Sequence, residues 1–226
     1  TSLLALGSVA NAQPLAAART YADNAIVFLD RDQPEGARSN IGRILSLIER
    51  MASIAKHLRS FARSPGQKLS VVDLPEAIEA AAEIAQLRLK TAGATLRLVL
   101  PGNLPKVVAG PVRLQQVLVN LLSNAADAVE DAANREVELR AEHADGTVRI
   151  CVRDHGPGVP PDLAGRIFDP FFSTKGVGRG LGLGLSISYN IVKDFGGNLT
   201  VAENEGGGAA FWLELRTAVP TAISAD

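Results

Sequence analysis

The most informative segment of the chain is Pro111-Val-Arg-Leu-Gln-Gln-Val-Leu-Val-Asn-Leu-Leu-Ser-Asn-Ala-Ala-Asp-Ala128. Its polar residues are spaced by three and four positions, so on a helix they share one narrow stripe: Arg113, Gln116, Asn120, Asn124 and Asp127. An ordinary amphipathic helix would turn such a stripe to solvent. Asparagine, however, is a poor helix former, and two of them four residues apart indicate a semi-buried polar cavity. A neutral amide oxygen can ligate Mg²⁺ while phosphates supply the negative charge.

Two glycine-rich segments follow this helix. Asp154-His-Gly-Pro-Gly158 comes directly after an apolar segment that reads as a strand. Its glycines allow a sharp exit and a close approach to a flat ligand, and its aspartate can accept a hydrogen bond from an exocyclic amine such as that of adenine. Gly176-Val-Gly-Arg-Gly-Leu-Gly-Leu-Gly184 leads into a helix and can present backbone amides to phosphates. A plain turn and a flexible linker are the alternatives for each segment taken alone. The second is neither a Walker loop nor a dinucleotide fingerprint.

A proline–glycine break at residues 64–68 separates two patterns of hydrophobicity. Before it, two heptad-patterned segments flank the charged turn 30–36, which predicts an antiparallel helical hairpin over residues 1–66. A lone hairpin cannot bury two apolar seams, so we expect a homodimer closed as a four-helix bundle. The alternative is that the seams pack against the second domain. The seam residues are Leu15, Ala18, Ala22, Ala25, Leu29, Ile41, Ile44, Ile48, Met51, Ala55, Leu58 and Ala62.

After the break, helical and strand patterns alternate in an α+β order. The sequence predicts a two-layer α/β sandwich over residues 67–219, with largely antiparallel strands, and a frayed tail over 220–226. The expected strands are 69–74, 95–100, 136–143, 147–153, 198–203 and 209–215, and the expected helices are 75–91, 111–131 and 184–195.

Composition excludes several classes of function. Lys+Arg is 23 and Asp+Glu is 24, a net charge of −1, which disfavours nucleic acid and an anionic membrane surface as partners. One cysteine and three scattered histidines exclude a disulfide scaffold and a Cys- or His-rich metal site. No apolar run is long enough to cross a membrane. Because the chain begins Thr-Ser-Leu-Leu, we expect it to be a fragment of a larger protein.

Taken in order, these segments resemble the sequence boxes of the sensor histidine kinases of two-component systems. Residues 114–128 resemble the N box, 154–158 the first glycine box, and 180–184 the second glycine box. The segment Phe168-Asp-Pro-Phe-Phe-Ser-Thr-Lys175 resembles the F box. Residues 182–197 are most similar to the C4-dicarboxylate sensor kinases, relatives of the nitrogen-regulatory sensors. The resemblance covers essentially the whole chain and implies a Bergerat-type ATP-binding fold after a dimerisation and histidine-phosphotransfer hairpin.

The resemblance also implies roles for individual residues. Asn124 would bind Mg²⁺ with Asn120 beside it, Asp154 would bind the adenine amine, and Lys175 would contact the phosphates of ATP or ADP. Residues 174–179 would form a mobile lid, anchored by three phenylalanines of the F box: Phe168, Phe171 and Phe172. The complete implied ATP site is Asn120, Asn124, Asp127, Asp154, Gly156, Gly158, Lys175, Gly180, Leu181, Gly182, Leu183 and Gly184.

One feature departs from that family. Sensor kinases carry the phosphoacceptor in a His-Glu pair shortly before Asn-Gln-Pro-Leu, but here Gln13-Pro-Leu follows Leu6-Gly-Ser-Val-Ala-Asn-Ala12. An ungapped alignment puts Val9 at the histidine position, and a gapped one omits a short segment that would contain it. His57 and His155 are no substitutes. The acceptor segment is therefore missing from this sequence, deleted by engineering, or naturally lost.

Three functions remain open. The first is an ATP-dependent protein-histidine kinase core that passes phosphoryl to an aspartate in the receiver domain of a response regulator, although this chain itself lacks the acceptor histidine. The second is an acceptor-less nucleotide-binding signalling module. The third, a Bergerat-fold ATP hydrolase, is disfavoured because Asn120 stands where such enzymes carry a glutamate, and an amide cannot take a proton. The kinase reading implies a cytoplasmic portion of an inner-membrane-anchored parent, with membrane contact only through absent parts.

Overall fold

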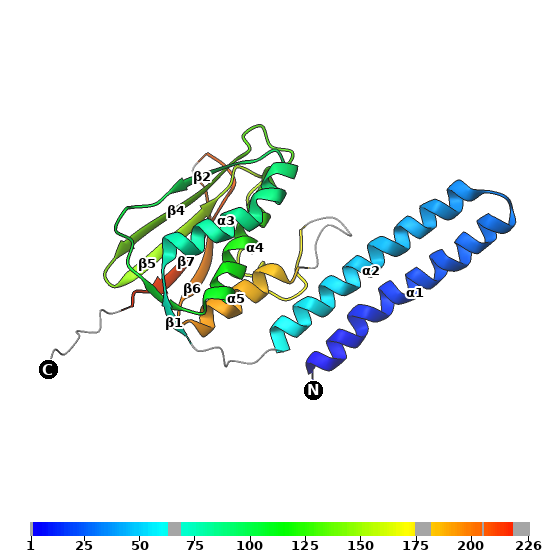
Figure 1. Ribbon diagram of the computed structural model, residues 1–226, viewed down its shortest axis with the longest axis horizontal. Helices are drawn as coiled ribbons and strands as arrows, with labels where there is room; N and C mark the ends of the chain where they lie inside the picture. Colours follow the sequence, from blue (N-terminus) through cyan, green and yellow to red (C-terminus); the bar gives the residue numbers. More distant parts are fainter. Residues whose placement is uncertain (1, 63–68, 175–181, 205, 219–226) are drawn as a thin grey trace. The chain divides into compact units, whose positions relative to one another are not determined.

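The computed structural model describes residues 2–62, 69–174, 182–204 and 206–218, which fall into two compact units. The first unit contains helices α1 (Ser2–Asp30) and α2 (Pro34–Ala62), and the second contains the other described helices and strands. Figure 1 shows the helical pair of the first unit and the mixed sheet of the second. No helix among the described residues is long and apolar enough to cross a membrane.

Helices α1 and α2 form the expected antiparallel hairpin. Its turn is tighter than the sequence pattern indicates, because α2 already begins at Pro34, and proline is well suited to the first turn of a helix. The amide of Gln33 donates to the carbonyl of Phe28 at 2.8 Å. Gly36 lies against the Phe28 ring, where a Cβ would stand 2.5 Å from the nearest ring carbon. This glycine therefore lets the two helices approach closely beside the turn.

The second unit is built on a five-stranded sheet in the order β2-β4-β5-β7-β6. Strand β2 runs parallel to β4, and the other neighbouring pairs are antiparallel. A separate two-stranded sheet pairs β1 with β3. The bounds are β1 Ser70–Val72, β2 Thr95–Val99, β3 Val107–Ala109, β4 Glu136–Ala144, β5 Thr147–Arg153, β6 Asn198–Glu203 and β7 Ala209–Arg216.

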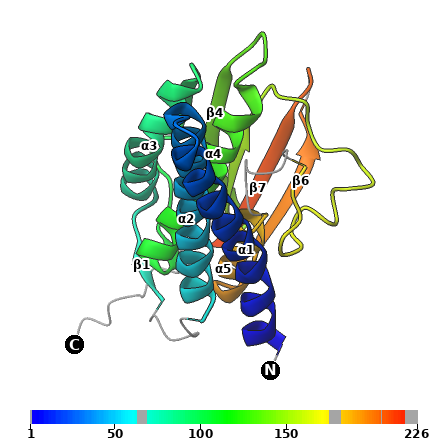
Figure 2. The same ribbon diagram turned by 90° about the vertical axis from the view of Figure 1, so that its right-hand side faces the viewer.

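Helices α3 (Leu74–Thr91), α4 (Pro111–Val129) and α5 (Gly184–Asp194) cover one face of this sheet. In Figure 2 the helical layer of α3 and α4 lies to the left of strands β6 and β7. Helix α4 occupies the middle and contacts both other helices. The core between the two layers consists mainly of aliphatic side chains from α3, α4, α5 and the inward-facing positions of the strands. The predicted α+β two-layer sandwich is confirmed.

The side chains that hold α4 against α3 include one ion-pair cluster. Arg88 of α3 donates to Asp127 of α4 at 2.5 Å and to Glu130 at 3.0 Å. All three side chains are partly exposed, so solvent screens these pairs and each contributes modestly to stability.

Candidate functional site

One face of α4 connects the two glycine segments. Asn120 and Ala128 lie eight residues apart on this face. At one end, the Asn120 amide donates to Ser188 Oγ of α5 at 2.9 Å, and a Cβ on Gly184 would stand 2.3 Å from Asn120 Oδ1. At the other end, a Cβ on Gly156 would stand 2.5 Å from the carbonyl oxygen of Ala128. The face therefore spans about 12 Å between the start of α5 and the loop after β5.

Asn124 lies midway along this face. Its side chain is half-buried, and within the described part of the chain its amide has no hydrogen-bond partner. Those same residues contain no group of three or more His, Cys, Asp or Glu side chains that could hold a metal ion. A cation at Asn124 would therefore take its other oxygen ligands from a bound molecule. This suits Mg²⁺ bound together with phosphates.

Asp154, directly after β5, is held firmly in place. It is 2% exposed, and its Oδ1 accepts hydrogen bonds from the amides of Gly156 (2.9 Å) and Ala209 (3.2 Å). Its own amide donates to the carbonyl of Ala209 at 2.9 Å. Both side-chain bonds end on Oδ1, so Oδ2 has no hydrogen bond to any described residue. One carboxylate oxygen thus anchors the side chain while the other stays free to accept a donor from a ligand.

The electrostatics of Asp154 follow from this burial. Desolvation raises the pKa of the Asp154 carboxyl, and the two amide donors, Gly156 and Ala209, offset part of that effect. A buried carboxylate with an unused acceptor is costly unless a ligand donates to it. The arrangement therefore favours a ligand that presents an N–H donor at this point.

Glycines close the loop around Asp154 backbone to backbone. A Cβ on Gly208 would stand 2.0 Å from the Asp154 carbonyl oxygen, and one on Gly158 would stand 3.1 Å from the Gly208 carbonyl oxygen. Both have positive φ, +97° for Gly208 and +74° for Gly158. The close backbone contacts and the positive φ values both favour glycine at these two positions. The first glycine segment can therefore pack directly against the β6–β7 turn beside Asp154.

The second glycine segment ends in the N-terminus of α5. No side chain caps this helix, and the amides of Gly184, Leu185 and Ser186 have no acceptor among the described residues. Gly182 precedes it with φ +64°, and a Cβ there would stand 2.3 Å from the Phe172 carbonyl oxygen. Open amides at the positive end of a helix form a favourable site for an anion such as phosphate.

The phenylalanines expected to anchor a lid pack beside this helix start. The amide of Phe171 donates to the Gly182 carbonyl at 2.9 Å, and the Phe168 ring lies 5.2 Å from the ring of Tyr189 on α5. Arg166 stacks on Phe172 at 5.0 Å. Much of the expected lid, residues 175–179, lies outside the described residues, as do Lys175, Gly180 and Leu181 of the expected ATP site.

Two expected site residues are engaged in contacts between helices. Asp127 is paired with Arg88 of α3, and Asn120 is bonded to Ser188 of α5. Of the polar stripe on α4, Asn124 is therefore the asparagine that keeps a free amide in the described structure. Sequence reasoning missed both partners, because Arg88 and Ser188 carry no local signal that links them to the stripe.

Sequence reasoning also missed Ala209, whose backbone amide donates to Asp154 Oδ1. A backbone contact of this kind cannot be recognised from the residue type. Leu183 takes the N-cap position of α5, and its carbonyl accepts from Ile187 at 3.0 Å. The expected residues that the structure brings together are thus Asn120 with Gly184, and Asp154 with Gly156 and, through Gly208, with Gly158.

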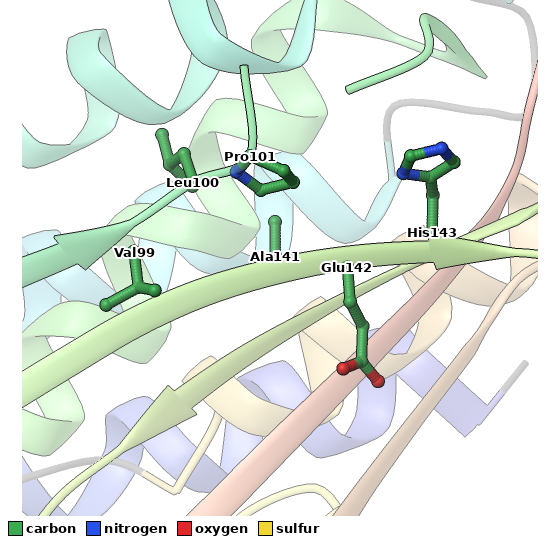
Figure 3. Close-up of a pocket in the computed structure, with 6 residues that line it drawn as sticks. All are labelled: Val99, Leu100, Pro101, Ala141, Glu142 and His143. Carbon is green, nitrogen blue, oxygen red and sulfur yellow. The ribbon is translucent and has the colours of Figure 1, made fainter. Parts of the chain in front are cut away.

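Two other features lie apart from this site. Figure 3 shows a shallow pocket where Leu100 and Pro101 face Ala141 of β4, while Glu142 points to the other side of the strand. It lies at the end of the sheet opposite Asp154, since His143 of β4 pairs with the beginning of β5 and Asp154 follows its end. Cys151 is fully buried, and burial raises the pKa of its thiol to about 12, which rules it out as a nucleophile.

Residues 109–219 match the family described as "Histidine kinase-, DNA gyrase B-, and HSP90-like ATPase". Among curated proteins, the chain is 40% identical over 209 residues to the C4-dicarboxylate transport sensor protein DctB of Pseudomonas aeruginosa, covering 92% of this chain and 34% of that protein. It is 37% identical to the protein of the same name from Rhizobium meliloti, covering 91% of this chain and 33% of that protein. The chain thus spans about a third of the length of these relatives.

Solved structures agree with these sequence matches. The full-length ShkA structure in complex with AMPPNP superposes with a TM-score of 0.67 at 32% identity, covering 82% of this chain and 40% of that one. The catalytic domain of the histidine kinase ThkA superposes with a TM-score of 0.59 at 28% identity, covering 66% of this chain and 96% of that one.

Proposed function

The chain belongs to the sensor histidine kinases, and from that premise we propose that it is the ATP-dependent core of a two-component sensor, binding ATP with Mg²⁺ along the half-buried polar face of α4. The observation that carries this proposal is the position of Asn124. Its amide, which bonds to no residue that the structure describes, lies midway between Gly156, beside the buried Asp154, and Gly184, at the open N-terminus of α5.

The described groups match the parts of a nucleotide in order. Asp154 Oδ2 accepts the exocyclic amine of adenine, and Gly156 and Gly158 shape the loop beside it by letting its backbone pack against Ala128 and Gly208. The amides that begin α5 bind phosphate oxygens, and Asn124 Oδ1 contributes one ligand to Mg²⁺. Mg²⁺ neutralises phosphate charge when bound. By family resemblance, Lys175, Gly180 and Leu181 complete the phosphate-binding part.

The surroundings of Asn120 favour phosphoryl transfer over hydrolysis. An amide cannot act as a general base, and the Asn120 amide nitrogen already donates to Ser188 Oγ. The carboxylate of Asp127, two turns further along α4, is paired with Arg88. The site therefore positions a phosphoryl group and stabilises its charge without activating water.

The first unit is proposed to form a homodimer. Large apolar side chains of α1 and α2 are about half exposed in the single chain, and a soluble monomer rarely leaves so many of them to water together. They are Leu15, Ile26, Val27, Leu29, Ile41, Leu45 and Ile48. A second hairpin would cover them as a four-helix bundle. A response regulator would receive the phosphoryl on an aspartate of its receiver domain, and the chain would be the cytoplasmic portion of a membrane-anchored sensor.

The missing acceptor supports a second reading. Residues 1–56 contain no histidine, so the printed chain has no imidazole at the family's acceptor position. A sensor with this sequence would bind ATP and transmit its conformation without being phosphorylated. The two readings share the nucleotide site and differ in whether phosphoryl leaves ATP.

Labelling with γ-³²P ATP separates them. We expect no acid-labile label on the chain as it stands, and label on the double variant Val9→His with Ala10→Glu, which restores the His-Glu pair in the ungapped alignment. The same double variant carrying Asp154→Asn is the matched control and should lose most of its label. Label on the unchanged chain would contradict the assigned acceptor position. No label on the restored chain, together with intact ATP binding, would favour the acceptor-less module.

A further inference from the structure

Asn204, between β6 and the turn to β7, is a polar residue inside the protein that the nucleotide site does not explain. It is 3% exposed, and both its Nδ2 and its Oδ1 are hydrogen-bonded. Nδ2 donates to the carbonyl oxygen of Asp154 at 2.9 Å, and Oδ1 accepts from Arg153 Nε at 2.8 Å and Nη2 at 2.5 Å. Asn204 therefore joins the β6–β7 turn to two consecutive residues at the end of β5.

Arg153 continues this connection across the sheet. It pairs with Glu138 of β4 at 3.7 Å, and Glu138 also bonds to Arg97 of β2. Arg97, Glu138 and Arg153 are direct cross-strand neighbours. Since Val137 and Leu139 lie in the core, Glu138 and its two arginine partners lie on the sheet face away from the helices. A row of charged groups thus leads across three strands to Asn204.

The end of this row fixes the backbone of Asp154 from both sides. Its carbonyl is held by Asn204 and its amide by Ala209. Gly208 packs directly on the same carbonyl. The backbone N–H of Asn204 donates to the Gly208 carbonyl at 3.1 Å and so shapes that turn. If Asn204 moves, the Asp154 carbonyl and the turn that carries Ala209 lose their shared support.

We infer that Asn204 is a positioning residue for Asp154, which orients the free Oδ2 toward the amine of an adenine base through its bond to the Asp154 carbonyl. The inference rests on the proposed nucleotide site. A hydrogen bond to a base depends on sub-ångström placement, and a displaced acceptor loses both affinity and selectivity. Asn204 acts through Asp154 and does not touch the nucleotide.

The variant Asn204→Asp tests this role with little change in volume. It keeps an acceptor for Arg153 but replaces the donor to the Asp154 carbonyl with a second acceptor, which repels that oxygen. Leu199→Ala is the matched control, because Leu199 is a buried β6 residue of the helix-facing core and its truncation destabilises the same strand without touching Asn204. Asp154→Asn reports on the nucleotide site itself.

Binding of ADP and GDP is measured by calorimetry with Mg²⁺, below the melting transition of every variant. We expect Asn204→Asp to raise the Kd for ADP about tenfold, as the loss of one oriented hydrogen bond implies. The ratio of the Kd for GDP to the Kd for ADP should therefore become smaller. Leu199→Ala should change neither. An unchanged ratio in Asn204→Asp, or an equal narrowing in Leu199→Ala, would overturn the positioning role.

A second readout does not depend on nucleotide. In the nucleotide-free protein, the amide resonances of Gly156 and Ala209 report their bonds to Asp154 Oδ1, and we expect both to shift in Asn204→Asp and not in Leu199→Ala. If Asp154→Asn leaves nucleotide binding unchanged, the proposed site fails, and these resonances alone decide whether Asn204 positions the carboxylate. If Asp154→Asn weakens binding while Asn204→Asp changes neither binding nor resonances, only the present inference fails.

Discussion

Gly184 and Asn120 are in direct contact: a Cβ on Gly184 would stand 2.3 Å from Asn120 Oδ1. Gly184→Ala must therefore displace the Asn120 side chain and weaken its bond to Ser188, at a cost of about 1 kcal/mol. Alanine otherwise stabilises a helix relative to glycine, so a fall in Tm identifies the clash. Gly165→Ala is the control, because a Cβ there meets nothing within 4 Å. Equal Tm values for the two variants would show that the contact is dispensable.

Asn124→Ala should remove the Mg²⁺-dependent part of ADP affinity, about tenfold or more, since loss of a metal ligand costs at least as much as loss of a group that supports one. Calorimetry with Mg²⁺ and with EDTA measures the difference. Folding should be unaffected, because the Asn124 amide bonds to no described residue. Ser123→Ala, on the same turn of α4, should keep the dependence on Mg²⁺. If the difference in ADP affinity between Mg²⁺ and EDTA is as large in Asn124→Ala as in the parent, Asn124 is not a ligand of the metal.

The affinity for adenosine should decrease as the pH is lowered, because Asp154 becomes protonated. Only the ionised carboxylate accepts the exocyclic amine at Oδ2, and burial raises the pKa of this carboxyl above its ordinary value of about 3.9. As pH is lowered towards that ordinary value, the parent should lose affinity before an exposed aspartate would take up a proton, while Asp154→Asn stays flat at a lower affinity. Parallel pH profiles for the two proteins would exclude Asp154 from the base-binding role.

The same pKa shift has a consequence for stability. A carboxyl whose pKa is raised by folding binds its proton more tightly in the folded state, so it lowers the free energy of unfolding as pH rises above the unfolded pKa. Asp154→Asn removes that cost at neutral pH. Its Tm should therefore equal or exceed that of the parent at about pH 7, even though its nucleotide affinity is lower.

Ile48→Glu should dissociate the proposed homodimer. Ile48 is 49% exposed in the single chain, and a charge in a covered seam would be buried without a partner. Light scattering should give the parent twice the 23.7 kDa chain mass and the variant a mass close to 23.7 kDa. Ser39→Glu, nine residues earlier and on the opposite side of α2, should remain a dimer. A parent of monomer mass at micromolar concentration would refute the bundle.

Elements with strong local patterns could be predicted from the sequence. Helix α4 follows from its apolar periodicity, and the β4–β5 hairpin follows from Asp145-Gly146, whose φ values of 52° and 75° suit the two-residue turn that this dipeptide favours. Strand β3 was missed because it has only three residues, Val107–Ala109, and its ladder partner β1 is equally short. The parallel pairing of β2 with β4 depends on the whole sheet and leaves no local trace.

The candidate site divides in the same way. Asp154 and the glycines could be predicted as site residues from their residue types, and the structure adds the contacts between them. The polar stripe on α4 was less informative, because spacing places Asn120, Asn124 and Asp127 on one face but does not reveal their partners. Arg88 lies 39 residues from Asp127, and Ser188 lies 68 residues from Asn120. Only tertiary packing shows which side chain of the stripe is left free.

The most direct test of the account is where a nucleotide binds. Amide chemical shifts recorded during titration with Mg²⁺ and ADP should change in a saturable way at Asn124, Gly156 and Leu185, which span the proposed site from the base to the phosphates. The amides of the pocket around Ala141 and His143, at the other end of the sheet, should not move. Shifts confined to that pocket, or no saturable shift at all, would contradict the assignment of the nucleotide to α4.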